Sequence, residues 1–392
     1  MSTGLKGFDR SVLVSIGATI GFITSPFLFL FSYALGAATV SAKSRTWPYF
    51  LVSISLDTYY AIANLTRNDE GDWGWYSEHF RFIKDMNFFD YLGATYDYIY
   101  IKPNEPFYYF LSYVFSLITD ANVPCYAVIL TFVIYGIFEL GTYLIVTTLN
   151  IGNTQKLVTF FVFILFGLQF NLMLQLIRQE LAMSLLLLAF AYMLRGRNGV
   201  GFINLILSVL THQSILVLCL VLIGPMFLLK RFNIWKMPLV MLYLCIVLIV
   251  GNYLGNSNFE AIDIDKDDGD ISWYLIAFDA FIAFAGVLLS DSRSHLGRTL
   301  TISIVGFYIL LFSLSGIKLA FLRIYFFIDL LRALSIVNII TRIGKPPLTV
   351  LFLIMGISFQ LAKIYTSPFF SFYDLLQLLI LPEVSIVQYF SD

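Results

Sequence analysis

The sequence contains few charged residues. Asp, Glu, Lys and Arg make up 12% of its 392 residues, and 59% of the residues are hydrophobic. Soluble globular domains carry about a quarter charged residues, so this composition, with a mean hydropathy of +0.83, excludes that class. One helix needs about 20 apolar residues to cross a bilayer. We therefore predict an all-α polytopic integral membrane protein, a single transmembrane domain over residues 1–392 with about 10–13 transmembrane helices.

Other features are scarce or missing. The 24 Lys and Arg residues are balanced by 25 Asp and Glu residues, which leaves no basic surface to follow a nucleic acid. The three cysteines lie in apolar runs without a second Cys or His nearby, so neither a zinc site nor a disulfide framework is indicated. There is no phosphate-binding glycine loop, serine elbow or HExxH motif. We expect no nucleic-acid partner, no metal and no cofactor.

Long apolar runs separated by polar breaks mark the predicted transmembrane helices. They cover residues 12–38, 47–64, 124–148, 156–175, 179–194, 237–254, 273–290, 299–316, 320–340 and 347–366. Two other apolar stretches, 105–119 and 372–390, are short or interrupted. The run 201–229 is too long for one upright helix and contains four polar residues from Thr211 to Ser214. Polar groups at membrane depth are tolerated where they line protein or a water-filled cavity. This run therefore predicts a broken pair of helices beside a site.

The distribution of Lys and Arg predicts the orientation in the membrane, because short basic loops stay on the cytoplasmic side. Five such groups occur, near residues 43–45, 195–197, 230–236, 293–298 and 342–345. The outer side then receives loop 65–104 and the acidic loop 257–271, which lacks the Gly and Glu of a calcium-binding EF-hand. Loop 65–104 is rich in aromatic residues and predicts a folded helical cap over a cavity. In this topology 105–119 does not cross the membrane.

Arg178 is the first candidate for chemistry. With Gln179 and Glu180 it interrupts an otherwise apolar stretch from Val158 to Leu194. A charged side chain within a span costs at least about 2.5 kcal/mol on insertion scales, which makes it a functional candidate. Near the start of a helix it would bind an anion such as a phosphate. The alternative is that Arg178 pairs with Glu180 or reaches the membrane surface.

A second basic pair lies at the outer end of the span 320–340. Arg323 and Lys318 fall on the predicted outer side, where basic residues are uncommon, and Tyr325 and Phe326 follow. Two cations at helix ends suit a diphosphate headgroup. The alternative is anchoring at the membrane interface, above all for Lys318.

His212 is the only one of the three histidines inside an apolar run, where its ring would act as a base or a donor near neutral pH. The alternative is a structural histidine that bonds a neighbouring helix. Asp72, Tyr76 and Glu105 lie in the cap or at its junction with the membrane. A carboxylate there would accept a proton or orient a sugar hydroxyl, although each is also compatible with a solvated loop residue.

Five short patterns occur in order along the chain. They are Asp72-x-x-x-Tyr76, Glu105–Pro106, Arg178–Gln179-x-x-Ala182, His212-x-Ser214 and Arg323-x-Tyr325–Phe326. Together they resemble the EpsG-like group of Wzy-type polysaccharide polymerases over nearly the whole chain. The sequence departs from that group before the aspartate, where only Gly71 remains of a small-residue segment, and Trp73 and Trp75 follow.

The resemblance implies a glycosyltransferase of the bacterial inner membrane, with its active site facing the periplasm. Such an enzyme joins undecaprenyl diphosphate-linked oligosaccharide repeat units of O-antigen or capsule, without metal or cofactor and with inversion. It implies a glycosyltransferase C-type fold, and membrane lipid and a chain-length regulator protein as further partners. Together with the reasoning from the residues above, it predicts Arg178, His212, Arg323 and Asp72 as catalytic residues. The predicted substrate-binding residues are Tyr76, Glu105, Gln179, Glu180, Ser214, Lys318 and Tyr325.

Two other functions stay open. A lipid-linked glycan flippase or other transporter would also need broken helices and buried charges, but the two halves of the chain show no symmetric pair of interrupted helices. A ligase that moves finished polymer onto a lipid acceptor would share the same patterns. Residue patterning does not separate ligase from polymerase; only the family resemblance does.

Overall fold

The computed structural model describes residues 46–65, 67, 71–93, 105–229, 237–256, 273–290, 295–315, 321 and 324–367. These residues form helices and no strand, which confirms the all-α prediction. Four described helices are long and apolar enough to cross a membrane: α7 (Val123–Val146), α9 (Ile177–Leu194), α14 (His295–Ser313) and α17 (Pro346–Tyr365). The chain is thus an all-α polytopic membrane protein.

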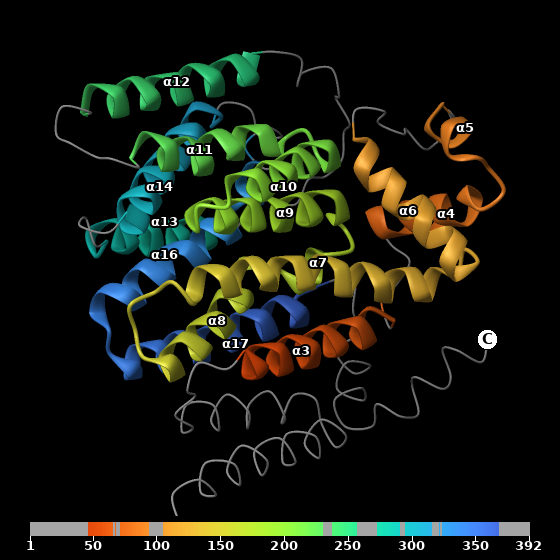
Figure 1. Cartoon of the computed structure of the whole chain (residues 1–392), viewed down its shortest axis with the longest axis horizontal. Helices are drawn as coiled ribbons and strands as arrows, with labels where there is room; N and C mark the ends of the chain where they lie inside the picture. Colours follow the sequence, from red (N-terminus) through yellow and green to blue (C-terminus); the bar gives the residue numbers. More distant parts are fainter. Residues whose placement is uncertain are drawn as a thin grey trace, which may run out of the picture.

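Other helices complete the bundle (Figure 1). They are α3 (Trp47–Leu65), α4 (Asp72–Ile83), α5 (Phe88–Gly93), α6 (Pro106–Thr119), α8 (Asn153–Gly167), η1 (Phe170–Leu172), α10 (Asn198–Thr211), α11 (Ile215–Leu228), α12 (Met237–Asn256), α13 (Trp273–Leu288) and α16 (Ile328–Ile343). Most predicted spans coincide with a helix to within a few residues. The run 201–229 is broken as predicted, into α10 and α11. The predicted span 12–38, the apolar stretch 372–390 and the acidic loop 257–271 lie outside the described residues.

Two predicted spans are wrong in extent. The span 156–175 ends early because α8 stops at Gly167, and Leu168 and Gln169 are extended. The amide of Gln360 on α17 donates to the carbonyls of Leu165 and Leu168, at 2.6 and 2.7 Å. Carbonyls at a helix end need such partners where water is absent. A polar side chain from a distant helix therefore permits this break.

The span 320–340 is interrupted as well. A turn at Phe326 and Phe327 precedes α16, which begins only at Ile328. The hydroxyl of Tyr325 donates to Asp279 of α13 at 2.6 Å. Because this bond holds the segment before the turn against another helix, the chain does not continue as one straight span.

Helix α9 lies in the middle of the bundle, between α7 and α10 (Figure 1). It is hydrophobic around most of its circumference, and nearly all of its residues are buried. A helix that is apolar on all sides is typical of a position in the centre of a bundle. The charged first turn of α9, with Arg178 and Glu180, is therefore enclosed by other helices.

The cap predicted for loop 65–104 is helical where it is described. Helices α4 and α5 pack against α6 at one end of the bundle, beside the start of α7 (Figure 1). Aromatic rings make this contact: Phe80 of α4 stacks on Tyr126 of α7 with ring centroids 3.8 Å apart, and Trp73 stacks on the same ring. The Nε2 atom of His79 hydrogen-bonds to the hydroxyl of Tyr91 at 2.7 Å.

Candidate functional site

Glu105 is the centre of a polar cluster. It stands at the N-cap of α6, just before Pro106, but its side chain does not cap that helix. One carboxylate oxygen, Oε2, accepts from Nη1 of Arg178 at 2.6 Å. The other oxygen, Oε1, lies 2.8 Å from Nδ1 of His212 and accepts from the backbone N–H of Gln213 at 3.2 Å. Glu105 is 2% exposed, so a single carboxylate joins three segments away from bulk water.

Arg178 reaches this carboxylate from the first turn of α9. Its Nε atom donates to the hydroxyl of Tyr76 on α4 at 3.2 Å, and Nη1 also donates to Tyr109 of α6 at 3.4 Å. The guanidinium carbon lies 5.9 Å from the centre of the Tyr76 ring. Among the described residues no hydrogen bond uses Nη2. The arginine is therefore held on one side and retains donors for a ligand.

His212 belongs to the predicted break between α10 and α11. Its backbone is extended, and it ends α10 by donating its N–H to the carbonyl of Ser208. The hydroxyl of Ser208 in turn donates to the carbonyl of Ala182, which ties the end of α10 to α9. Within the described part of the chain, Nε2 of His212 makes no hydrogen bond, and the side chain is 18% exposed. This nitrogen is thus available to a substrate.

The cap is attached to the bundle beside this cluster. Gly71 has φ +64°, a left-handed conformation that glycine adopts without strain. A Cβ atom at Gly71 would lie 2.6 Å from Oε1 of Gln175. The same oxygen accepts the backbone N–H of Asp72 at 2.6 Å. The polar break between α8 and α9 therefore sets where α4, and with it Tyr76, begins.

The charges of the cluster favour an ionised carboxylate. Burial alone would raise the pKa of Glu105, but the hydrogen bond from His212 and the positive charge of Arg178 lower it to about 2. Burial and the same arginine lower the pKa of His79 to about 4. At neutral pH Glu105 is therefore an anion, and His79 in the cap is uncharged.

The structure brings four of the predicted site residues together: Tyr76, Glu105, Arg178 and His212. Asp72 lies one turn before Tyr76, is exposed and interacts electrostatically with it. Arg178 pairs with Glu105. The alternative that it pairs with Glu180 is therefore wrong.

Other predicted residues lie elsewhere or are not placed. Glu180 is 3% exposed and interacts with Asp329 on α16. Gln179 is buried, and the buried hydroxyl of Ser214 has no hydrogen-bond partner among the described residues. Tyr325 bonds Asp279 instead of joining the cluster. Lys318 and Arg323 lie outside the described residues.

Sequence reasoning missed a second polar cluster inside the bundle. Arg332 of α16 forms ion pairs with Asp279 of α13 and with Asp329, one turn earlier in α16. The amide of Gln169, in the break after α8, donates to both oxygens of Asp329 at 2.7 Å. All four side chains are buried. The sequence did contain a signal for this cluster, because its charged residues lie inside predicted apolar spans. Asp57 and Glu139, whose carboxyl groups are also buried, show the same signal.

No group of three or more His, Cys, Asp or Glu side chains within the described ranges is arranged to hold a metal ion. The chemistry available at the Glu105 cluster is that of one arginine, one imidazole, one carboxylate and two phenols. Such a set binds anions and transfers protons.

Comparison with known proteins identifies the family. The model of the EpsG family matches residues 49–375, a range that includes the Glu105 cluster and the Arg332 cluster. No curated protein and no solved structure matches the chain. The chain therefore belongs to the EpsG family, a family of Wzy-type polysaccharide polymerase-like membrane proteins.

Proposed function

We propose that this protein is a surface-polysaccharide polymerase of the bacterial inner membrane. It joins undecaprenyl diphosphate-linked oligosaccharide repeat units, such as those of O-antigen, at the periplasmic face. The observation that carries the proposal is that Glu105 binds Arg178 and His212 at the same time, at 2.6 and 2.8 Å. Arg178, which can bind an anion, and His212, which can accept a proton, are thus bridged by one carboxylate. Displacement of a diphosphate by a hydroxyl requires both kinds of group.

Arg178 would stabilise the leaving group. When the bond between the anomeric carbon and the diphosphate oxygen breaks, negative charge develops on that oxygen. Preorganised donors aimed at developing charge contribute strongly to catalysis. Glu105, Tyr76 and Tyr109 hold the guanidinium in place, so its remaining Nη2 donors need little reorganisation to contact the diphosphate.

His212 would be the general base, and Glu105 sets its tautomer. Glu105 is ionised at neutral pH because its pKa is about 2, and its Oε1 atom accepts the N–H of Gln213. An ionised carboxylate only accepts hydrogen bonds, so Nδ1 of His212 carries a proton and donates it. Nε2 is then the basic nitrogen. It takes the proton of the acceptor hydroxyl while the hydroxyl oxygen forms the new glycosidic bond.

This arrangement resembles the carboxylate–imidazole pair of hydrolases, in which the carboxylate orients the ring and stabilises its protonated form. One displacement at the anomeric carbon, from the face opposite the diphosphate, inverts its configuration. Asp72 and Tyr76 of the cap would orient sugar hydroxyls beside the reacting carbon. Every step uses side chains of this chain, without metal or cofactor.

The first test is polymerisation in proteoliposomes. Purified protein is incubated with lipid-linked repeat units extracted from the host strain, and the products are separated on a gel. We expect a ladder for the wild type, no ladder for Arg178→Ala, and turnover reduced by about 10²-fold or more for His212→Ala. Glu78→Gln and Arg81→Ala alter exposed residues of α4 and serve as matched controls that keep the ladder.

Other outcomes of this assay separate the competing functions. Substrate that changes sides of the membrane without new bonds would identify a flippase. Finished polymer that is transferred to a different lipid acceptor, without any ladder, would identify a ligase. A normal ladder from Arg178→Ala would refute the role of the arginine.

A further inference from the structure

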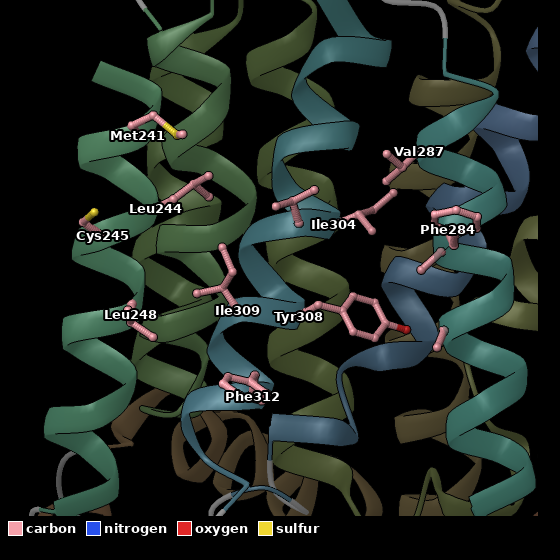
Figure 2. Close-up of a pocket in the computed structure, with 13 residues that line it drawn as sticks. Met241, Leu244, Cys245, Leu248, Phe284, Val287, Ile304, Tyr308, Ile309 and Phe312 are labelled. Carbon is pink, nitrogen blue, oxygen red and sulfur yellow. The ribbon is translucent and has the colours of Figure 1, made fainter. Parts of the chain in front are cut away.

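An apolar groove runs along the surface of three helices (Figure 2). Helix α14 forms its floor, with α12 on one side and α13 on the other. Its volume is about 970 Å³. Apart from the sulfur atoms of Met241 and Cys245 and the hydroxyl of Tyr308, its lining side chains are hydrocarbon; Leu244 and Leu248 on α12, Ala283 and Phe284 on α13, and Val305 and Phe312 on α14 are representative.

The groove offers a ligand almost no polar partner. Ala280, which lines it, directly follows Asp279, whose carboxylate is buried and pairs with Arg332 instead of facing the groove. The Tyr308 ring points from α14 towards α13 (Figure 2), and its hydroxyl is buried without a hydrogen-bond partner among the described residues. A polar group of a ligand would be costly to bury in this groove, because it would find almost no hydrogen-bond partner there. The chemistry of the groove therefore selects a hydrocarbon occupant.

The dimensions of the groove disfavour a transmembrane helix as that occupant. Along α14 the lining residues extend from Ile304 to Phe312, which is about 12 Å at 1.5 Å per residue. The hydrocarbon core of a bilayer is about 30 Å thick. A helix from a second copy of the chain would thus find a complementary surface over less than half of its length. A flexible chain of lipid matches a short, wide groove better.

The groove lies one helix away from the Glu105 cluster. Helix α11 packs against α12 and α14 on one side and against α9 and α10 on the other. It begins at Ile215, three residues after His212. A lipid chain that leaves the cluster over the end of α11 has this one helix to pass, about 10–12 Å across with its side chains, on its way to the groove.

We propose that this groove holds the polyprenyl chain of the lipid-linked substrate. The inference rests on the proposed function, which supplies a lipid whose diphosphate lies at Arg178. The groove anchors the chain, and α11 separates the chain from the reacting sugar. Binding of the chain then contributes to affinity for the donor, while the chemical step depends on the Glu105 cluster alone.

Cys245 provides a direct test that needs no catalysis. A variant that retains only this cysteine is labelled with a benzophenone maleimide in phosphatidylethanolamine–phosphatidylglycerol vesicles that contain undecaprenyl diphosphate. Irradiation should yield a polyprenyl adduct at least tenfold more abundant than at a control cysteine introduced at Phe281. Phe281 is 67% exposed and lies on α13 outside the groove lining. Adducts of phospholipid alone, a crosslinked dimer, or equal polyprenyl labelling at both positions would overturn the proposal.

A second test uses substrates of different chain length. Ala283→Trp and Val305→Trp would fill the groove from its wall and its floor. Both should raise the KM for the undecaprenyl donor at least tenfold and leave the KM for a ten-carbon donor unchanged, whereas Phe281→Trp changes neither. An equal effect on both donors would refute the proposal. If no donor is polymerised, the proposed function fails, and the crosslinking result still decides whether the groove binds the chain.

Discussion

Glu105→Gln is the most informative perturbation of the cluster, because it removes one charge and preserves shape. The pKa of Glu105 is lowered from 4.5 to about 2 when the folded protein forms. Each pH unit of difference corresponds to about 1.36 kcal/mol, so the ionised carboxylate stabilises the folded state by about 3 kcal/mol at neutral pH. Loss of one partner of a buried ion pair costs about 3–5 kcal/mol, which is a similar magnitude.

The sign of the pH dependence follows from the lowered pKa. The stabilisation is complete above pH 4.5 and disappears as the pH falls towards 2. Thermal unfolding, followed by tryptophan fluorescence in detergent, should show a Tm for Glu105→Gln roughly 5 °C or more below the wild type at pH 7. The difference should narrow below pH 4.5.

The control for this experiment is Glu78→Gln, which changes an exposed residue of α4 and should unfold with the wild type. A difference in Tm between the wild type and Glu105→Gln that stays constant from pH 7 to pH 3 would refute the reasoning. So would a variant as stable as the wild type at pH 7.

Three further predictions concern stability and use the same unfolding measurement. Gly71→Ala should cost about 1 kcal/mol or more, because its φ is +64° and Gln175 occupies the space of a Cβ, whereas Gly199→Ala, with no neighbour within 4 Å, should be neutral or stabilising. Asp279→Asn should cost about 1.5–3 kcal/mol, because it removes the charge from the acceptor of two hydrogen bonds of the buried Arg332, which keeps Asp329 as its ion-pair partner; unchanged unfolding would mean that this ion pair is dispensable. Gln360→Leu should cost about 1–3 kcal/mol by leaving two helix-end carbonyls without a donor, and a neutral result would contradict the account of the break after α8.

The positions of the helices followed largely from the sequence. Apolar runs of membrane-spanning length predicted α3, α7, α9, α12, α13 and α17 to within a few residues. The polar residues around His212 predicted the break between α10 and α11. These predictions succeed because the bilayer imposes one local rule, that each lipid-facing segment is apolar and helical.

The hydropathy of the sequence did not predict the breaks at Gly167 and before Ile328. Both interrupt apolar sequence, and both depend on side chains from other helices: Gln360 supplies donors to the end of α8, and Asp279 accepts from Tyr325. Hydropathy is a property of one segment, so it carries no information about a partner almost 200 residues away. The groove between α12, α13 and α14 escaped prediction for the same reason.

The sequence by itself determined that the chain is a helical membrane protein and that Arg178 and His212 are unusual within apolar runs. Only the tertiary structure decided their partner. Residues two apart on a helix face in nearly opposite directions, so Arg178 and Glu180 point to different neighbours. Arg178 meets Glu105, 73 residues earlier, while Glu180 interacts electrostatically with Asp329 of α16 and Tyr135 of α7. Burial of charge in a low-dielectric interior demands a partner, but packing of distant helices selects which residue that partner is.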